Sequence, residues 1–522
     1  MTAEPQQITA NPSQDAPQNL GLLLERRVGI APEKHFLFSE ADGRRFTFAQ
    51  FDDAVNRASR MLKSNGVSQG DVVSLLMPNS VEYIIAYFAC WKLGAIAGPV
   101  NSLLKADEVA FVISDSDAKV LLVHSDFLPT IYSISHGLPD LRAVIEFDDE
   151  ATATNGLSAE TIAIGEETDV NLDSEAIIIY TSGTTGKPKG CLLTHGNLIA
   201  NARQISQWLG FTKDDRLLTV MPLFHMNAVS VTTISALYAG GSTVVSPKFS
   251  ASRFWQIVSD YEVTSFGSVA TMLSILLGTY PDGVPKGLKT DQLRFAMCGS
   301  APVPTEVLQR FEETFNCLVI EGYGLSESTC RSTFNPPDER RRPGSCGKAI
   351  GNEMQVVDEE DREVTNGELG EIVMRGENIL KGYYKNKEAT ATAFRNGWFH
   401  TGDIGYRDAD GFFYIVDRKS DMIIRGGENI YPREIDQILY QHPAVAAAAT
   451  IGVPDPLYGE EVAAFLVLKE GSQATEEDII SFCRARLADF KCPKSVRIVR
   501  DIPKGPTGKL LKRELSRLYS SV

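Results

Sequence analysis

Strand-like and helix-like stretches alternate from residue 47 to residue 259, and this alternation limits the fold more than any other feature of the chain. Apolar side chains recur at helical spacing over 47–64, and the apolar run at 72–77 then has the composition of a buried strand. A helical stretch at 81–93 leads into a second apolar run at 95–100. Such alternation is typical of α/β layers built on largely parallel sheets. It continues at 119–124, 199–209, 242–246 and 254–259.

The composition of the chain changes near residue 350, where glycine and charged residues become frequent. Short apolar runs at 354–357, 371–375 and 412–416 predict a small β-rich subdomain. A hinge is predicted at 417–420, after which helical and strand-like patterns alternate again. The predicted fold class is therefore α/β: a large N-terminal domain of layered α/β subdomains plus a β-rich subdomain, with a small mobile C-terminal α+β domain.

The predicted divisions are a disordered tail at 1–24, an N-terminal domain at 25–417 and a C-terminal lid domain at 418–522. A chain of 522 residues is too long for one compact core, which agrees with several structural units. The start of the chain is polar and rich in Pro, Gln and Asn, a composition typical of disorder rather than of a signal peptide.

Charge and cysteine content restrict the partners and the compartment. A formal net charge of -16 argues against general binding to nucleic acid or to anionic membranes. The most apolar stretch, 83–100, is interrupted by Lys92 and Gly94, so no membrane span is expected. The eight cysteines form no CxxC pair, which predicts free thiols in a reducing cytoplasm rather than a zinc site or disulfides.

The segment from Thr181 to Gly190 reads TSGTTGKPKG and directly follows the apolar run at 176–180. Its glycines, hydroxyls and lysines suit a polyphosphate, because backbone N–H groups approach closely and ammonium groups neutralise charge. A P-loop is excluded by the spacing of the glycines and by Pro188, which stands where that motif needs Ser or Thr. The segment is instead expected to join two strands, with an ordinary hairpin turn as the weaker alternative. The candidate phosphate-binding residues are Thr181, Ser182, Gly183, Thr184, Thr185, Gly186, Lys187 and Lys189.

A second motif, EGYGLSES at 321–328, follows the apolar run at 318–320. Two glycines let a flat ligand stack against the backbone and an aromatic ring, while a carboxylate is the natural ligand for Mg²⁺ beside phosphate oxygens. The carboxylate in question is that of Glu327, and in isolation a solvated loop carboxylate is the simpler interpretation. The candidate nucleotide-binding residues here are Glu321, Gly322, Tyr323, Gly324 and Ser326.

Three further residues have a chemistry that suits a nucleotide. Asp403 stands between glycines, where a carboxylate can accept both hydroxyls of a ribose. Lys509 follows a Pro- and Gly-rich loop, and a positioned lysine can offset charge that develops during phosphoryl transfer. Alone, Asp403 would be interpreted as a turn residue, Arg418 as half of a surface ion pair and Lys509 as a solvated lysine.

In this order the motifs resemble those of the adenylate-forming superfamily, and within it the branch of acyl- and aryl-CoA synthetases. The resemblance covers about residues 25–520 and identifies the N-terminal domain as an AMP-binding domain. It implies that Tyr323 stacks on adenine, that Ser326 contacts the α-phosphate, and that Mg²⁺ is held by Glu327 and Thr184. Asp403 and Arg418 match the ribose-contacting pair of the family.

The resemblance also implies roles for weaker motifs. The segment CGSAP at 298–302 matches the wall shared by the adenine pocket and the acyl tunnel, which involves Gly299, Ser300 and Ala301. Gly426 and Gly427 match backbone that lines the pantetheine tunnel. Lys491 and Lys494 fall where relatives contact the nucleotide of CoA. Ser420 departs from the family, which usually places Asp or Lys at that hinge position, so a charged hinge switch is not expected.

The acyl pocket is expected around the segment MPLFHMNAV at 221–229. The resemblance makes His225 a gate, whereas an isolated histidine would be interpreted as a packing residue. Relatives that activate amino acids carry Asp there, and acetate-specific relatives carry Trp where this chain has Gly324. A mainly apolar acid of medium size, aliphatic or aromatic, is therefore expected. The pocket residues are His225, Met226, Val229, Ser268, Val269, Ala270, Met272, Gly299 and Gly324.

The predicted function is an ATP-dependent acid–thiol ligase that forms acyl-AMP and pyrophosphate and then transfers the acyl group to CoA. The expected catalytic residues are Lys509, Thr184, Glu327 and His225, and the expected cofactors are ATP, Mg²⁺ and coenzyme A. Two alternatives stay open: an adenylase that uses a carrier-protein thiol or a luciferase-like oxidation, and a nucleotide-binding pseudoenzyme. A cytoplasmic enzyme without integral membrane contact is expected, with a homodimer left open.

Overall fold

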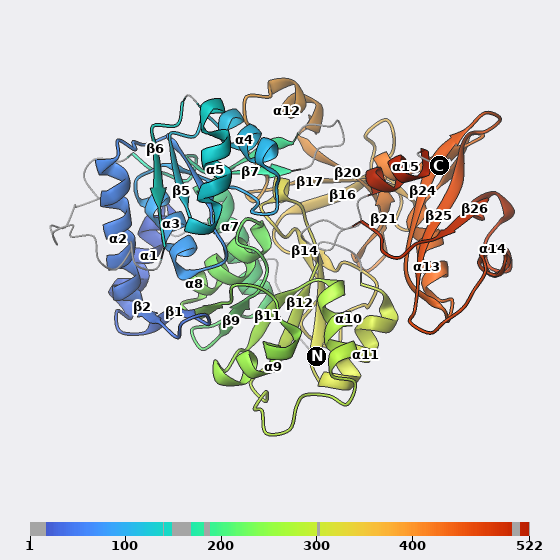
Figure 1. The fold of residues 1–522 in the computed structure, drawn as a ribbon, viewed down its shortest axis with the longest axis horizontal. Coiled ribbons are helices and arrows are strands. Elements are labelled where there is room, and N and C mark those ends of the chain that lie inside the picture. The colour runs from blue at the N-terminus through green and yellow to red at the C-terminus, as the bar shows by residue number, and fades with distance from the viewer. Residues whose placement is uncertain are drawn as a thin grey trace.

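The computed structural model describes residues 17–138, 140–148, 169–181, 188–299, 303–503 and 512–520. Within these residues the strands form four sheets. Figure 1 shows the two large helix-covered sheets in blue, teal, green and yellow, with the last sheet, in orange and red, set apart at one end of the molecule. The described candidate residues of the first 418 positions therefore belong to the larger body.

The first large sheet has seven strands in the order β18-β8-β7-β4-β3-β5-β6. The strands from β7 to β6 are mutually parallel, whereas β8 and β18 are antiparallel additions at one edge. The bounds are β3 Val72–Leu76, β4 Ile96–Pro99, β5 Val120–Val123, β6 Ala143–Glu146, β7 Glu175–Thr181, β8 Lys189–Thr194 and β18 Gly382–Tyr383. The loop predicted to bind phosphate thus joins two antiparallel neighbours, as expected.

The second large sheet has nine strands in the order β15-β14-β13-β12-β11-β9-β10-β1-β2. Its central strands, from β13 to β1, are parallel, so their carboxyl ends meet at one edge. The bounds are β1 His35–Ser39, β2 Arg45–Thr47, β9 Arg216–Thr219, β10 Ser242–Val245, β11 Ser265–Ser268, β12 Phe295–Cys298, β13 Leu318–Tyr323, β14 Thr333–Phe334 and β15 Lys348–Ala349.

Helices cover these two sheets, and their ends follow sequence signals. Thr47 begins α2 with a capping box that includes Gln50, and Thr194 begins α7 in the same way with Asn197. Gly210, with φ of 63°, ends α7. The bounds are α1 Leu20–Ile30, α2 Phe48–Ser64, α3 Val81–Lys92, α4 Ala106–Asp115, α5 Leu128–Ile134, α7 His195–Leu209, α8 Ser235–Ala239, α9 Ala251–Asp260, α10 Ala270–Thr279, α11 Thr305–Phe315 and α12 Lys387–Ala393. A wide-turn π-helix, η3 Asn227–Ile234, precedes α8.

The β-rich subdomain is a five-stranded antiparallel sheet in which β20 pairs with both β17 and β21. The bounds are β16 Glu353–Val357, β17 Gly370–Arg375, β19 Phe394–Arg395, β20 Trp398–Arg407 and β21 Phe413–Arg418. The strands expected at 354–357, 371–375 and 412–416 correspond to β16, β17 and β21.

The C-terminal sheet has its own two apolar clusters, one on each side, built only from residues beyond 422. Its two longest strands, β24 and β25, form an antiparallel hairpin. The bounds are β22 Ile423–Arg425, β23 Glu428–Ile430, β24 Val445–Asp455, β25 Gly459–Leu468, β26 Ser495–Ile498, α13 Pro432–Tyr440, α14 Glu476–Arg484 and α15 Lys512–Ser520. A separate core means that this unit is stabilised independently of the rest.

The predicted fold class is confirmed, because layered α/β sheets, a β-rich subdomain and a separate C-terminal α+β unit are all present. One boundary differs: helix α1 begins at Leu20, inside the tail expected at 1–24. Asn19 caps this helix, and Leu20, Leu23 and Leu24 are buried. Burial of these leucines outweighs the polar composition before them.

Candidate active site

The structure describes the two ends of the predicted phosphate-binding loop. Thr181 is the last residue of β7, and Lys189 is the first residue of β8. Thr181 and Lys189 lie opposite each other in the antiparallel register. The ammonium group of Lys189 lies 5.3 Å from the centre of the Tyr383 ring, a cation–π distance. Residues 182–187 of the loop, which include Ser182, Gly183, Thr184, Thr185, Gly186 and Lys187, lie outside the described residues.

Glu327 lies on the short 3₁₀ turn η4, Ser326–Ser328, directly after β13. The hydroxyl of Tyr383 donates a 3.1 Å hydrogen bond to Oε1 of Glu327, and Tyr383 is the last residue of β18, the edge strand that pairs with β8. The half-buried carboxylate of Glu327 therefore lies beside the base of the predicted phosphate loop. Lys189, Tyr383 and Glu327 form one contact chain.

This arrangement fits a magnesium ion that takes its other ligands from phosphate. No group of three or more metal-ligating side chains exists among the described residues, so these residues offer no complete protein cage. Glu327 keeps one carboxylate oxygen beyond the one that accepts from Tyr383. A single carboxylate with substrate phosphates and water is the usual protein environment of Mg²⁺.

Tyr323, Asp403 and Arg418 converge from three strands. The Tyr323 hydroxyl donates a 2.5 Å hydrogen bond to Oδ2 of Asp403, and Nε of Arg418 lies 3.1 Å from Oδ1 of the same carboxylate. Asp403 and Arg418 are directly opposite in the β20–β21 register. Burial, and then the neighbouring Asp403 carboxylate, raise the pKa of Tyr323 well above its ordinary value, so the phenol keeps its proton. The predicted ribose pair and the predicted adenine platform are thus one hydrogen-bonded unit.

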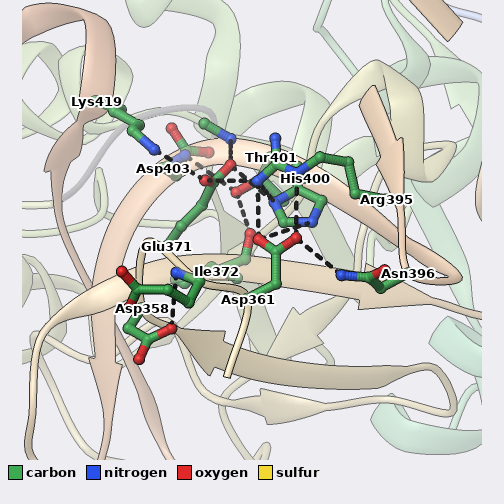
Figure 2. Close-up of polar contacts among 12 residues, drawn as sticks. Asp358, Asp361, Glu371, Ile372, Arg395, Asn396, His400, Thr401, Asp403 and Lys419 are labelled. Atoms are coloured by element: carbon green, nitrogen blue, oxygen red, sulfur yellow. Dashed lines mark hydrogen bonds and ion pairs between the residues drawn. The ribbon is translucent and has the colours of Figure 1, made fainter. Parts of the chain in front are cut away.

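A buried polar network supports the backbone beside Asp403 (Figure 2). Glu371 of β17 accepts a 3.1 Å hydrogen bond from the Gly402 amide and lies 3.5 Å from Nδ1 of His400. Lys419, the residue after β21, reaches the same carboxylate at 3.3 Å. Figure 2 shows Asp361 and Arg395 completing the network around His400. Glu371 therefore connects strand β20 beside Asp403 to Lys419, which lies within the predicted hinge at 417–420.

The glycines of the second motif are required by close contacts. A Cβ on Gly322 would lie 2.5 Å from the Phe334 ring, and one on Gly324 would lie 2.1 Å from the Cys330 carbonyl oxygen. Neither position has room for a side chain. Burial raises the pKa of Glu321 to about 7, and its carboxylate accepts a hydrogen bond from the Gly344 amide at 2.9 Å.

His225 stands in the middle of the segment 221–229, around which the acyl pocket is expected. Its Nε2 is buried without a hydrogen-bond partner among the described residues, and burial lowers the pKa of the ring to about 4. The ring is therefore neutral at physiological pH and packs against Phe224 at 4.6 Å between centroids. A neutral imidazole suits a wall or gate better than a cationic contact.

The other pocket candidates gather at the carboxyl edge of the nine-stranded sheet. Ser268 ends β11 and donates to the Met297 carbonyl at 3.1 Å, while Gly299 follows β12. Val269 and Met272 are buried, Ala270 starts α10, and Met226 and Val229 are buried around the start of η3. Ser300 and Ala301 lie outside the described residues.

The described candidates of the C-terminal unit are Gly426, Gly427, Lys491 and Lys494. Gly426 and Gly427 form the turn between β22 and β23, with φ of 59° and 92°, which favours glycine. Lys491 pairs with Glu434 at 2.7 Å, and Lys494 lies 3.7 Å from Glu461. Both lysines thus have carboxylate neighbours. Lys509 lies outside the described residues.

Two residues of this region were missed from the sequence. Tyr383 contacts Glu327 from 56 residues away, and its Gly-Tyr-Tyr context has no chemical signature. Arg331 is only 2% exposed, and its Nε and Nη2 lack partners among the described residues. The sequence signal that could have identified Arg331 was its position among small residues, four positions after Glu327.

Comparisons with known proteins find relatives along almost the whole chain. The profile of the AMP-binding enzyme family matches residues 24–384, and that of the AMP-binding enzyme C-terminal domain matches 434–509. The sulfoacetate–CoA ligase of Cupriavidus necator is 35% identical over 95% of this chain and 97% of its own. The long-chain-fatty-acid–CoA ligase FadD13 of Mycobacterium tuberculosis is 36% identical over 97% and 99%.

A solved structure has the same fold. The o-succinylbenzoate coenzyme A synthetase MenE of Bacillus subtilis, in complex with ATP and magnesium ion, superposes with a TM-score of 0.84 at 33% identity. The match covers 94% of this chain and 98% of that one.

Proposed function

The chain belongs to the AMP-binding enzyme family and is an AMP-forming acid–CoA ligase, and on this premise we propose how its residues divide the two half-reactions. The enzyme uses ATP, Mg²⁺ and CoA. The observation that carries the proposal is the convergence of Tyr323, Asp403 and Arg418 beside Glu327.

In the first half-reaction a carboxylate oxygen of the acid attacks the α-phosphorus of ATP, and the bond to the bridging oxygen breaks as pyrophosphate leaves. Asp403 accepts the ribose hydroxyls, and Arg418 holds that carboxylate in place. Tyr323 presents its ring to adenine while its hydroxyl fixes Asp403. Ser326 lies on η4 beside these groups and contacts the α-phosphate.

The loop 181–189 holds the phosphates that leave, with Thr181 and Lys189 at its base. Glu327 and Thr184 hold Mg²⁺, which supplies charge neutralisation at the phosphates. Lys509 offsets the negative charge where the carboxylate meets the α-phosphate. Ser182, Gly183, Thr185, Gly186 and Lys187 complete the phosphate contacts in this proposal.

In the second half-reaction the small domain, 418–522, rotates about 417–420. The CoA sulfur loses its proton to solvent and attacks the acyl carbonyl carbon, and AMP leaves. Gly426 and Gly427 then line the thiol tunnel, and Lys491 and Lys494 contact the CoA nucleotide after exchanging their present carboxylate neighbours. Separate apolar cores on the two sides of the hinge support a rigid-body rotation.

The acid occupies the pocket between η3 and the ends of β11 and β12, with His225 as its gate. The acids in the relatives' names range from sulfoacetate to a long-chain fatty acid. These names therefore do not identify the acid that this enzyme activates. Gly324 carries no side chain, whereas acetate-specific relatives have Trp at this position, and this difference supports an acid of medium size.

We also place the enzyme in the cytoplasm, since all eight cysteines are free. None of the described helices is long and apolar enough to cross a membrane. A homodimer remains a proposal that light scattering of the purified enzyme would test.

The deciding experiment follows AMP, pyrophosphate and thiol consumption over a panel of carboxylic acids with and without CoA. Acyl-CoA formed in equal amount to AMP supports the proposal. AMP formed without loss of free thiol would point to a carrier-protein or luciferase-like acceptor. Absence of AMP with every acid would contradict the proposed catalytic assignment.

A further inference from the structure

Arg331 is a buried cation whose charge the surrounding protein leaves incompletely paired. Its side chain is among the largest that are fully enclosed. Nε and Nη2 have no hydrogen-bond acceptor among the described residues, and no ion pair of Arg331 occurs there. The Phe334 ring lies 5.5 Å from the guanidinium carbon and offers only a weak cation–π contact. A buried charge normally has a carboxylate partner, because its loss of hydration is costly.

The guanidinium lies against Gly299, a residue of the proposed acyl pocket. A Cβ on Gly299 would be 2.5 Å from Nη2 and 2.7 Å from Nη1, so only a glycine leaves space for the guanidinium there. Gly299 follows β12, whose last residue Cys298 pairs with Ser268 of β11. Arg331 therefore lies at the carboxyl edge of these strands, where the proposed acid binds.

The backbone of Arg331 is held firmly. Asn201 of α7 donates a 2.6 Å hydrogen bond to the Arg331 carbonyl and accepts one from its amide at 3.3 Å. Ser230 of η3 in turn donates to the Asn201 side chain at 3.0 Å. Helix α7 and η3 thus fix Arg331 relative to the segment that carries His225.

A second buried polar group without partners lies on the same segment. Both polar atoms of the Asn227 amide lack hydrogen bonds among the described residues, and the residue is only 5% exposed. Its Oδ1 is 2.9 Å from the Cβ position of Gly267, the residue before Ser268. Asn227 and Arg331 therefore face neighbouring strand ends, and both have hydrogen-bonding capacity that an apolar acid would leave unused.

We propose that Arg331 binds a second anionic group of the acid, so that the substrates are acids with a carboxylate to be activated and a carboxylate or sulfonate at the far end. Asn227 provides a neutral hydrogen bond to the same group. This inference rests on the proposed function, because it specifies the acid that the pocket takes. The expected substrate class thereby changes from a mainly apolar acid, as the sequence suggested, to an acid with two negative charges.

The test compares acids of equal length with and without the second charge: succinate with butanoate, glutarate with pentanoate, and adipate with hexanoate. 3-Sulfopropanoate separates a sulfonate from a carboxylate preference. Acid-dependent AMP release gives kcat/KM for each acid. The wild-type enzyme is expected to prefer the best dianionic acid at least about tenfold over its monoanionic partner, because a buried arginine strongly rejects a group that cannot pair with it.

The variant Arg331→Met is expected to lower kcat/KM for that dianionic acid by about a hundredfold or more, while the value for the monoanionic partner is unchanged or rises. Arg331→Lys keeps the charge but loses the planar fork, so an intermediate loss is expected. The KM for ATP stays the same in both variants. Arg362→Met, at an exposed arginine that pairs with Asp358, is the matched control and changes neither acid.

Equal loss of activity toward both acids in Arg331→Met and Arg331→Lys would overturn the inference, since it would indicate a structural role. A wild-type enzyme without preference for the second charge would also overturn it, and that result needs no variant to fold. In either case the proposed function survives if AMP and acyl-CoA form with monoanionic acids. Failure of every acid to yield AMP would instead overturn the proposed function.

Discussion

The Tyr323 hydroxyl donates a 2.5 Å hydrogen bond to the carboxylate of Asp403, which lies 80 residues further along the chain. The bond joins the last residue of β13 in the nine-stranded sheet to β20 in the β-rich subdomain. Two sheets with separate hydrogen-bond ladders are thus locked together at the proposed ribose site.

Replacing Tyr323 by Phe removes the hydrogen bond to Asp403 but keeps the aromatic ring. We expect the KM for ATP to rise about five- to tenfold with a smaller effect on kcat, because a buried carboxylate loses a hydrogen bond worth about 1–2 kcal/mol. The KM for ATP and kcat are measured from steady-state AMP release at saturating acid. Asp403→Asn and the double variant complete a mutant cycle, and strictly additive effects would contradict a direct coupling of the two side chains.

Lys509 is expected to act in adenylation alone. Lys509→Ala should abolish acid-dependent exchange of pyrophosphate into ATP, while thioester formation from supplied acyl-AMP continues at close to the wild-type rate. Lys504→Ala, five positions earlier in the same loop, serves as the control. Equal loss of both half-reactions would show that the proposed division of labour is wrong.

Gly324 is expected to tolerate no side chain at all. Its added Cβ would lie 2.1 Å from a backbone oxygen, so Gly324→Ala must move the chain that carries Glu327 and Arg331. We expect a loss of about 2–4 kcal/mol in the free energy of unfolding, together with most of the activity. Urea unfolding measures the first effect.

Gly278→Ala is the matched control, because nothing lies within 4 Å of its Cβ position in α10. There the change should be neutral or stabilising by up to about 1 kcal/mol. Similar losses in both variants would show that the close contact at Gly324 does not govern stability.

Asp436 is expected to make stability fall as pH rises. Burial raises its pKa to about 7, Oδ1 lacks a partner among the described residues, and Lys512 and Asp417 are the charged groups that influence it. Below the unfolded pKa of about 3.8 the native and unfolded states are both protonated; between that value and 7 only the native state keeps the proton. The wild-type protein therefore loses stability across this window and levels off above it.

Asp436→Asn does not titrate at this position, so its stability relative to the wild type should rise by about 2 kcal/mol from pH 5 to pH 8. Denaturant melts at the two pH values measure this difference, and a fixed offset from the asparagine itself cancels. A pH-independent difference would mean that the Asp436 carboxyl titrates at its ordinary pKa.

The sequence predicted the layered fold because burial and periodicity determine it locally. Helix α2 and strand β3 follow directly from apolar spacing. Helix α1 was missed because its leucines follow a polar tail, and their partners lie on elements distant in sequence. Periodicity cannot report such partners.

The site was predicted to the extent that its residues occur in motifs. Asp403 and Arg418 were identified from their contexts, and the structure places them in contact. Tyr383, Glu371 and Arg331 act through neighbours in other strands, and their types are common on protein surfaces. What distinguishes them is burial beside a particular group, which only the folded chain defines.

Arg418 is both the residue that holds Asp403 and the last residue of β21, within the proposed hinge at 417–420. Strand β21 therefore both contributes to the proposed ribose site and leads into the small domain. If domain orientation alters how Arg418 meets Asp403, nucleotide affinity and orientation are thermodynamically linked, and each changes the other by the same factor. Non-hydrolysable analogues of ATP and of acyl-AMP would then shift the orientation of the small domain through Arg418, in addition to the proposed contact with Lys509.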